Sequence, residues 1–484
     1  MGQTDEMNPH CLAASNATEP WKMKNKLKEI PGSITAPKGF QTSAVFCDIK
    51  RLGTGKGSQK GNKRDLALIV SEVPAAVAGM FTTNQVCAAP VKVCIQRAKG
   101  GRAQALVVNS GNANACTGKQ GLADAREMVS FTEHALDLPK GSVLVGSTGR
   151  IGVAMPMDNV RAGIVEAATL LGTGAEHAAR AAEAIMTSDT KPKQIAIEFT
   201  LGGKTVRIGG ICKGAGMIQP GMSGTGVRPP ALPRALHATM LCFITTDAAI
   251  EAKALQAALQ EAVAHSFNRI TVDGDMSTND TVLVLANGLA ENPLVVGDEV
   301  TSLKSKKGKV RDPSHRLLRD FDSFQSALTH VCLELAKKIV RDGEGVHRVV
   351  TVRVNGAKNI HDADAAARAV ANSALVKTSW HGGDPNWGRI IDAIGYSPAT
   401  VVEEKIGIGY GAPGSRKILW SLKRGQPTKA TFKQLCRAVA PKEFELHINL
   451  NLGRASAVMY AADLTEEYVD FNKGDVSDPT TLGG

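Results

Sequence analysis

The sequence contains few aromatic residues and no long apolar run. Phe, Trp and Tyr account for 4% of its 484 residues, so it offers few of the aromatic platforms on which the bases of a single-stranded nucleic acid stack. No stretch reaches the roughly 18 consecutive apolar residues that a transmembrane helix requires. We therefore expect neither a nucleic acid nor a membrane as a partner.

Paired cysteines and metal-binding spacings are also missing. The nine cysteines are scattered and include no CxxC pair, and no group of His and Cys residues has the spacing of a zinc site. An odd number of scattered cysteines, several of them within apolar stretches, is typical of reduced thiols in an intracellular protein. The sequence therefore predicts reduced cysteines and no metal.

Composition and length are those of a folded protein with several domains. Apolar residues make up 43% and charged residues 21% of the chain, which excludes a largely disordered protein. A chain of 484 residues corresponds to about two to four domains. Lys and Arg outnumber Asp and Glu by 57 to 46, and the net charge of +11 suits anionic ligands or solubility. Residues 1–38 lack arginine and a secretory apolar core, so we expect a flexible N-terminal tail.

Hydrophobic periodicity predicts alternating strands and helices, as in an α/β protein of layered sheets. Two stretches interrupt this pattern. The basic segment Thr301–Arg319 is expected to be a solvated loop, and Ser223–His237 holds prolines and glycines that cannot continue a regular element. The expected strands are Leu66–Glu72, Ala105–Asn109, Leu241–Thr246, Val350–Val354 and the hairpin Ile195–Thr200 with Thr205–Ile208, and the expected helices are Ala162–Leu171, Ala175–Met186, Glu251–Ser266 and Phe321–Val340.

Three short segments carry residues suited to chemistry, namely Lys213–Ile218, Ala238–Leu241 and Ile244–Ala248. A lysine beside a Gly-x-Gly stretch matches neither the P-loop nor the dinucleotide-binding pattern. A hydroxyl directly before an apolar strand is also explained as a strand-edge or capping residue. Taken singly, the three segments do not define a reaction.

Several longer motifs occur in a fixed order around these segments. They are Met80–Asn84, Asn109–Gly118, Gly146–Gly152, Asp273–Asp280, Asp342–Gly345 and Asp384–Ile390. Together with the three segments above, they resemble the ornithine acetyltransferase family, the bifunctional glutamate N-acetyltransferases of arginine biosynthesis. The resemblance runs from about Gly39 to Ser477.

The resemblance implies a layered α-β-β-α sandwich with a second, smaller α/β domain. It also implies cleavage of the chain by itself between Ala238 and Thr239. Residues 39–238 would form an α chain and residues 239–484 a β chain, both contributing to one active site. Members of the family assemble as α2β2 heterotetramers from one precursor. A cytoplasmic location is expected, with the mitochondrial matrix as the alternative.

The implied reaction is transfer of an acetyl group from N-acetyl-L-ornithine to L-glutamate through an acetyl-threonine intermediate. A threonine hydroxyl needs a base beside it, and cleavage would give Thr239 an α-amine with a reference pKa of about 7.7–8.0. Thr148 and Gly149 occupy the family's oxyanion-hole positions. By residue type alone they also fit a plain turn, for which Gly149 and Gly152 serve equally well. No metal or organic cofactor is expected, and acetyl-CoA is a candidate co-substrate.

The resemblance also implies substrate contacts. Lys213 suits an amino acid carboxylate, and Glu344 suits the ammonium group of ornithine, although both also fit exposed turns. Thr187 aligns with a substrate-contacting threonine, and Thr190 is the alternative. The implied substrate-binding residues are Thr187, Lys213, Thr239, Glu344, Asn472 and Ser477.

One departure from the family matters for processing. The family has almost nothing where Ser223–His237 stands, directly before the bond to be cleaved. The extra residues either relax a strained turn that cleavage needs or bulge outward and leave the turn in place, because loop length alone costs little entropy. We favour the second. Two alternatives to the transferase follow: a self-processing amidohydrolase or aminopeptidase, in which water receives the acyl group, and an unprocessed, non-catalytic relative.

Overall fold

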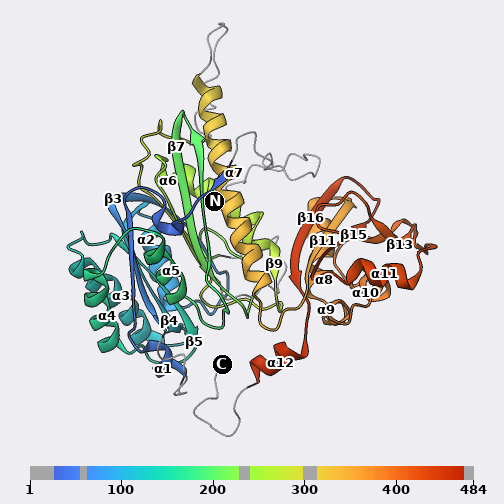
Figure 1. Cartoon of the computed structure of the whole chain (residues 1–484), viewed down its shortest axis with the longest axis horizontal. Coiled ribbons are helices and arrows are strands. Elements are labelled where there is room, and N and C mark those ends of the chain that lie inside the picture. The colour runs from blue at the N-terminus through green and yellow to red at the C-terminus, as the bar shows by residue number, and fades with distance from the viewer. Residues whose placement is uncertain (1–26, 55–62, 228–239, 298–312, 474–484) are drawn as a thin grey trace, which may run out of the picture. The chain divides into compact units, whose positions relative to one another are not determined.

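The computed structural model describes residues 27–54, 63–227, 240–297 and 313–473. The chain divides into two compact units. Residues 350–459 form the smaller unit, and the described residues before and after them form the larger one. Strands and helices alternate in both units (Figure 1), so the predicted α/β class with a second, smaller α/β unit is confirmed.

A nine-stranded sheet organises the larger unit. Its strand order is β1-β6-β7-β8-β10-β3-β4-β5, and β2 also pairs with β3. Strands β8 and β10 are parallel, as are β4 and β5, whereas β3 is antiparallel to both β10 and β4. The strands are β1 (Lys28–Glu29), β2 (Phe40–Val45), β3 (Leu66–Phe81), β4 (Arg102–Asn112), β5 (Val143–Arg150), β6 (Lys193–Leu201), β7 (Lys204–Lys213), β8 (Leu241–Thr246) and β10 (Thr281–Ala286).

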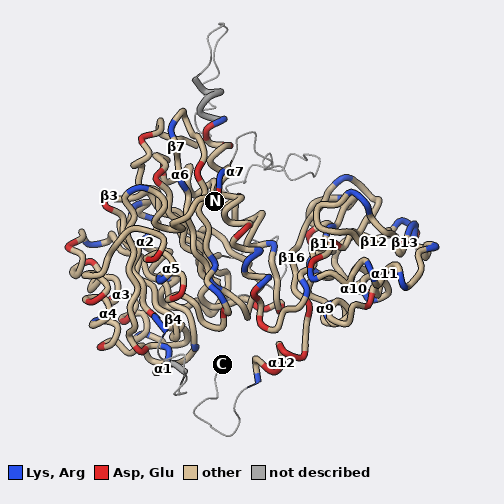
Figure 2. Tube along the Cα trace, in the orientation of Figure 1, with Lys and Arg blue, Asp and Glu red and all other residues tan. Residues whose placement is uncertain are grey.

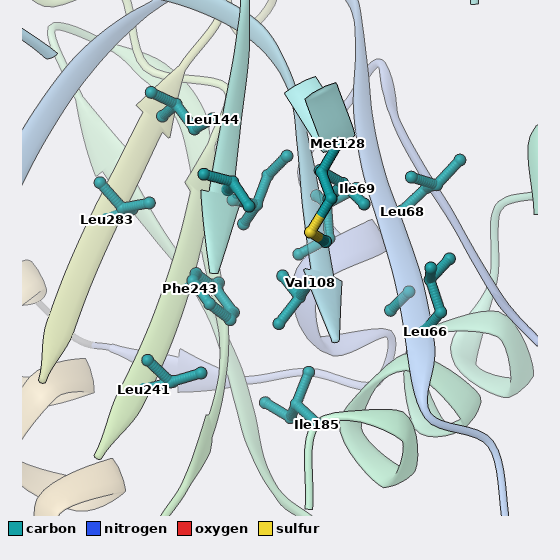
Figure 3. Packing of buried hydrophobic residues seen from close by; sticks show 14 of the residues in the cluster. Leu66, Leu68, Ile69, Val108, Met128, Leu144, Ile185, Leu241, Phe243 and Leu283 are labelled. Carbon is teal, nitrogen blue, oxygen red and sulfur yellow. The ribbon is translucent and has the colours of Figure 1, made fainter. Parts of the chain in front are cut away.

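This sheet folds back on itself to form two layers. In a flat sheet β8 and β5 would be four strand spacings, or about 19 Å, apart. A Cβ placed on Gly146 of β5 would nevertheless lie 3.0 Å from Cζ of Phe243 on β8. Leu241, Phe243 and Leu283 therefore face Val108 and its neighbours across a shared apolar core (Figure 3).

Helices cover the outer face of each layer. On one side α6 packs on β3, and α7 packs on β6 and β7; on the other side α2 and α3 pack on β5. This arrangement agrees with the predicted α-β-β-α sandwich. The helices of the larger unit are α1 (Ile49–Thr54), α2 (Ala89–Ala98), α3 (Gly118–Ala135), α4 (Met157–Thr169), α5 (Ala175–Ala184), α6 (Ala252–Ala264), α7 (Pro313–Arg341) and α12 (Glu466–Asn472).

The smaller unit is built on the sheet order β14-β13-β12-β15-β11-β16. The short strand β9 (Ile270–Thr271) of the larger unit pairs with Tyr460 and Ala461, which also belong to the larger unit. The elements are β11 (Val349–Ala357), α8 (Ile360–Asn372), α9 (Ala374–His381), α10 (Trp387–Gly395), β12 (Gly407–Gly411), β13 (Leu419–Lys423), β14 (Gln426–Pro427), α11 (Phe432–Val439), β15 (Glu443–Asn449) and β16 (Ala455–Ala462). Basic and acidic residues are interspersed along both units (Figure 2).

Strand β3 is longer than predicted. It spans sixteen residues rather than ending at Glu72. The pairing with β4 shifts register between Val70 and Ala75, so Pro74 is accommodated at an irregularity where no ladder hydrogen bond is needed. The second half of β3 then continues as the partner of β10. By contrast, β8 has the bounds that were predicted.

Two loop or tail predictions are corrected by the structure. Helix α7 begins at Pro313, where a proline suits the first turn, so residues 313–319 are helical and not part of a loop; residues 301–312 lie outside the described ranges. Strand β1 pairs with β6 and Ile34 is fully buried, so residues 27–38 belong to the fold rather than to a tail. In the described part of the chain, no helix has both the length and the apolar character needed to cross a membrane.

Candidate active site

The start of β8 is held by the residue before β10. The amide of Met240 donates a hydrogen bond to Oδ1 of Asp280 at 2.6 Å, and the carbonyl of Met240 accepts one from the amide of Thr281 at 3.1 Å. Met240 and Asp280 are both fully buried. The predicted cleavage residues Ala238 and Thr239 lie outside the described ranges, and Met240 is the next residue along the chain.

The chain on the other side of the predicted cleavage point is anchored in the same part of the sheet. Ser223 forms a two-way backbone pair with Phe81, Phe81 is opposite Thr281, and Thr281 is opposite Leu241. Ser223 and Leu241 are thus linked through the paired strands β3 and β10. The first residue of the predicted insertion is therefore part of the sheet, whereas residues 228–237 lie outside the described ranges.

The carboxyl group of Asp280 has a second, unused oxygen. Its Oδ2 is buried and has no hydrogen-bond partner among the described residues. Burial raises the pKa of Asp280 well above its ordinary value, although the amide of Met240 and the charge of Lys213 act in the opposite sense. The start of β8 therefore rests on a carboxyl group whose ionised form is disfavoured.

The Thr148 side chain is buried on β5 without a partner. Its Oγ1 has no donor or acceptor among the described residues. The carbonyl of Ser147 accepts a 2.8 Å hydrogen bond from Nδ2 of Asn279, which also donates to the carbonyl of Ala113 at 2.7 Å. Because Asn279 directly precedes Asp280, this contact places Thr148 near the start of β8. A buried hydroxyl without a partner costs about 1–3 kcal/mol, which makes this group a candidate for contact with a ligand.

Gly149 lies where β4 and β5 come closest. Its φ is +133°, and a Cβ there would lie 2.3 Å from the carbonyl carbon of Gly111 and 2.5 Å from the amide nitrogen of Asn112. A Cβ on Gly152 would meet open space. The two glycines therefore have different surroundings. The close approach of β4 accounts for glycine at position 149, and its role as an oxyanion donor stays a prediction.

Lys213, at the end of β7, is buried beside Asp189. The side chain of Lys213 is 2% exposed, and its Nζ lies 3.9 Å from Oδ2 of Asp189. Burial opposes the ionisation of Asp189, but the charges of Lys213 and Lys193 outweigh it and lower the pKa of Asp189 to about 2. Burial lowers the pKa of Lys213 below its ordinary value, although Asp189 acts in the opposite sense. Lys213, for which an exposed turn was the alternative to a substrate contact, is thus buried next to an ionised carboxylate.

The structure distinguishes between the two candidate threonines. The hydroxyl of Thr190 donates to Oδ1 of Asp342, and its amide donates to Oδ2 at 3.1 Å. The amide of Thr187 instead donates to Oδ2 of Asp189 at 3.0 Å, the oxygen that faces Lys213. Thr190 is therefore engaged in holding the chain, and a substrate contact of Thr187 stays a prediction.

Glu344 and Asn472 are brought together from distant parts of the chain. The amide of Glu344 donates to the carbonyl of Ala215 at 2.9 Å, and a Cβ on Gly216 would lie 2.3 Å from Oε2 of Glu344. The carboxylate thus rests on the backbone that follows Lys213. Asn472, 128 residues away, donates to Oε2 of Glu344 at 2.9 Å. Ser477 lies outside the described ranges.

The sequence is similar to that of a known protein family over most of its length. The sequence model of the ArgJ family matches residues 50–474. A protein of Symbiobacterium thermophilum called arginine biosynthesis bifunctional protein ArgJ is 44% identical over 92% of this chain and 98% of its own length. A glutamate N-acetyltransferase of Methanocaldococcus jannaschii is 41% identical over 92% of this chain and 99% of its own length.

The chain belongs to the ArgJ family. Among solved structures, an ArgJ protein of Bacillus halodurans is 40% identical, covers 42% of this chain and 100% of its own, and has a TM-score of 0.38. An ornithine acetyltransferase of Mycobacterium tuberculosis, crystallised with ornithine, is 36% identical, covers 41% of this chain and 100% of its own, and has a TM-score of 0.37.

Within this ArgJ-family chain, the described candidate residues all lie in the larger unit and form two groups. One group surrounds the start of β8, and the other surrounds Lys213. Sequence reasoning assigned no role to four neighbouring residues. Asn279 and Asp280 lie within one of the motifs, and Asp189 follows Thr187 closely, so these three could have been noticed. Nothing in the sequence marks Lys193 as buried, since an isolated lysine is usually solvated. Across the described ranges, no group of three or more His, Cys, Asp and Glu residues is placed to hold a metal ion.

Proposed function

We propose that this ArgJ-family enzyme transfers the acetyl group of N-acetyl-L-ornithine to L-glutamate in two half-reactions. The observation that carries the proposal is the unpartnered hydroxyl of Thr148, buried beside the segment that holds Met240. An acyl transferase needs such a donor at the point where negative charge develops on the acyl oxygen. Met240 directly follows the proposed nucleophile Thr239, and consecutive Cα atoms are about 3.8 Å apart.

In the first half-reaction the hydroxyl oxygen of Thr239 bonds to the acetyl carbon, and the α-amine of Thr239 takes the hydroxyl proton. Thr148 and Gly149 donate hydrogen bonds to the resulting oxyanion. The bond between the acetyl carbon and the nitrogen of ornithine then breaks, and the proton moves from the α-ammonium of Thr239 to that nitrogen. The products are free ornithine and an acetyl ester on Thr239.

In the second half-reaction the amino group of glutamate attacks the ester. The ester bond to Thr239 breaks, the threonine oxygen regains a proton, and N-acetylglutamate leaves. Both substrates carry a carboxylate, for which the buried cation of Lys213 is suited. Ornithine also carries a side-chain ammonium, for which the carboxylate of Glu344 is suited. Thr187, Asn472 and Ser477 complete the proposed set of substrate contacts.

The free α-amine of Thr239 requires cleavage of the bond between Ala238 and Thr239. Attack of the Thr239 hydroxyl on the carbonyl of Ala238, followed by hydrolysis of the ester, would supply it. The anchoring of Ser223 and Leu241 by backbone pairing in the same sheet supports this step, because extra residues between two fixed ends change neither end. We infer an α2β2 assembly in the cytoplasm, with no metal or organic cofactor and with acetyl-CoA as a candidate co-substrate.

Two measurements on the full chain test the proposal. Denaturing electrophoresis should show two fragments of about half size, and sequencing should find Thr-Met-Leu, residues 239–241, at a new N-terminus. The purified protein should release ornithine from N-acetylornithine in a glutamate-dependent manner. Thr239→Ala should give one intact band and no release. Release that ignores glutamate would identify a hydrolase instead, and an intact, inactive wild-type chain would identify a non-catalytic relative.

A further inference from the structure

Asp189 joins the segments that carry two proposed substrate contacts. Its side chain is 0% exposed. One carboxylate oxygen accepts from Nζ of Lys193 at 2.6 Å and from the amide of Gly214 at 2.7 Å. The other accepts from the amide of Thr187 at 3.0 Å and faces Nζ of Lys213 at 3.9 Å. A single carboxylate therefore fixes the backbone at Thr187 and the backbone directly after Lys213.

The two lysines around Asp189 are held differently. Lys193 lies between two carboxylates, with Nζ at 2.6 Å from Asp189 and 2.5 Å from Asp342. The 3.9 Å from Lys213 to Asp189 is longer than a hydrogen bond of 2.7–3.2 Å. Asp189 thus makes its short contacts with Lys193 and with backbone amides, whereas its contact with the ammonium group of Lys213 is longer and electrostatic.

We propose that Asp189 is a positioning residue that keeps Lys213 charged and holds it level with Thr187 to receive the carboxylate of an amino acid substrate. Lys193 is part of the same arrangement, because its ion pair with the other oxygen of Asp189 holds the carboxylate in place between Thr187 and Lys213. This inference rests on the proposed function and extends it from the contact residues to the group that arranges them.

The proposal has a consequence for pH dependence. The titratable groups that face Lys213 are Asp189, Lys193, Glu344 and Asp280. Burial and Lys193 lower the pKa of Lys213, whereas the carboxylates raise it. Removing the charge of Asp189 would therefore lower that pKa further, so that Lys213 would lose its proton at a lower pH. An opposite charge at this range shifts a pKa by about 1–3 units.

The test compares three variants of the full chain by the pH dependence of kcat/KM for N-acetylornithine. In Asp189→Asn the alkaline limb should move to lower pH by about one unit or more, and KM at pH 8 should rise about tenfold or more while kcat changes less. Asp189→Glu keeps the charge and should retain the wild-type limb. Glu445→Gln is the matched control, since Glu445 is also a buried carboxylate paired with a cation and a glycine amide, but it lies on β15 of the smaller unit.

The outcomes separate the inference from the function on which it rests. An inactive wild-type enzyme would refute the function. An active wild-type enzyme whose alkaline limb is unchanged in a folded Asp189→Asn variant would refute the positioning role. If Asp189→Asn fails to fold, the test rests on Asp189→Glu. A shift of the alkaline limb of kcat/KM in that variant, despite the retained charge, would contradict the proposal. An equal shift in Glu445→Gln would show a general effect of lost stability and would also overturn it.

Discussion

Asn472 donates a 2.9 Å hydrogen bond to the carboxylate of Glu344. The helix that carries Asn472 is itself fixed on the turn that carries Glu344. Thr465, which caps α12 by accepting from the amide of Tyr468 at 3.0 Å, donates from the same hydroxyl to the carbonyl of Gly345 at 2.7 Å. The Glu344 carboxylate is therefore oriented by the C-terminal helix and does not depend on the turn alone.

This relationship predicts the effect of Asn472→Ala. The variant loses one hydrogen bond to a charged group at an exposed site, so KM for N-acetylornithine should rise about threefold to tenfold. The melting temperature should hardly change, because Asn472 is exposed. Steady-state kinetics and thermal unfolding check both. Asp470→Asn, which removes the exposed ion pair between α12 and Lys473 directly after it, should leave KM as it is. An equal rise there would argue for a general effect on α12.

The unpartnered hydroxyl of Thr148 predicts an unusual combination of stability and activity. Thr148→Val replaces a buried, unsatisfied oxygen with a methyl group, so stability should be retained or should rise by up to about 1 kcal/mol. Activity should fall about 10²–10³-fold in kcat, as when an oxyanion donor is removed. Thr42→Val is the control: its buried hydroxyl donates to the carbonyl of Leu68 at 2.5 Å, so the loss should be in stability and not in kcat. Full activity in Thr148→Val would remove Thr148 from the mechanism.

Glu445 predicts acid sensitivity of the smaller unit. Arg353 donates to both of its oxygens, at 2.8 and 2.9 Å. Burial opposes ionisation, but His447 and Arg353 outweigh it and lower the pKa of Glu445 to about 2. A lowered pKa adds stability above the ordinary value near 4.5, and this stability is lost as the pH falls toward 2.

The free energy of unfolding of Glu445→Gln should therefore be lower than that of wild type by on the order of 2–3 kcal/mol at pH 7 and should approach it near pH 2. Urea unfolding followed by tryptophan fluorescence reports this unit, because Trp380, Trp387 and Trp420 all lie in it. The exposed Glu404→Gln should not alter the curve. A deficit that stays constant with pH would exclude ionisation as the cause.

The bounds of a strand could be predicted from the sequence where all residues of the strand are equally buried. Strand β8 is apolar throughout and fully buried, and its bounds were predicted. The strand predicted for β3 ended at Glu72, because Glu72 and Pro74 suggested a turn. In the structure a register shift carries β3 past these residues into the second layer. Strand β1 has only two residues, too few to produce any periodicity.

The candidate site could be predicted only for those residues that stand in recognisable sequence motifs. Thr148, Lys213 and Glu344 stand in motifs whose order is informative. The pairing of Asp189 with Lys193 could not be predicted, because a charged residue in a single sequence normally indicates solvent exposure. Only the fold brings the two together with Asp342 and buries all three, where burial makes each charge depend on its partners.

Gly149 provides a test of how closely β4 and β5 must approach each other. Gly149→Ala would place a Cβ 2.3 Å from the backbone of Gly111, in a φ of +133° that a side chain disfavours. The opposing atoms belong to the buried backbone of Gly111 and Asn112, which cannot yield cheaply, so the variant should lose several kcal/mol or fail to accumulate as folded protein. Gly152→Ala is the control, with a φ of +79° and open space around its Cβ. It should cost only the strain of about 1–2 kcal/mol for a left-handed residue. The substitution keeps the backbone N–H of Gly149 but forces β4 and β5 apart. A folded Gly149→Ala protein with wild-type kcat would therefore show that the two strands can separate without loss of activity. That result would contradict a rigid oxyanion site at this position.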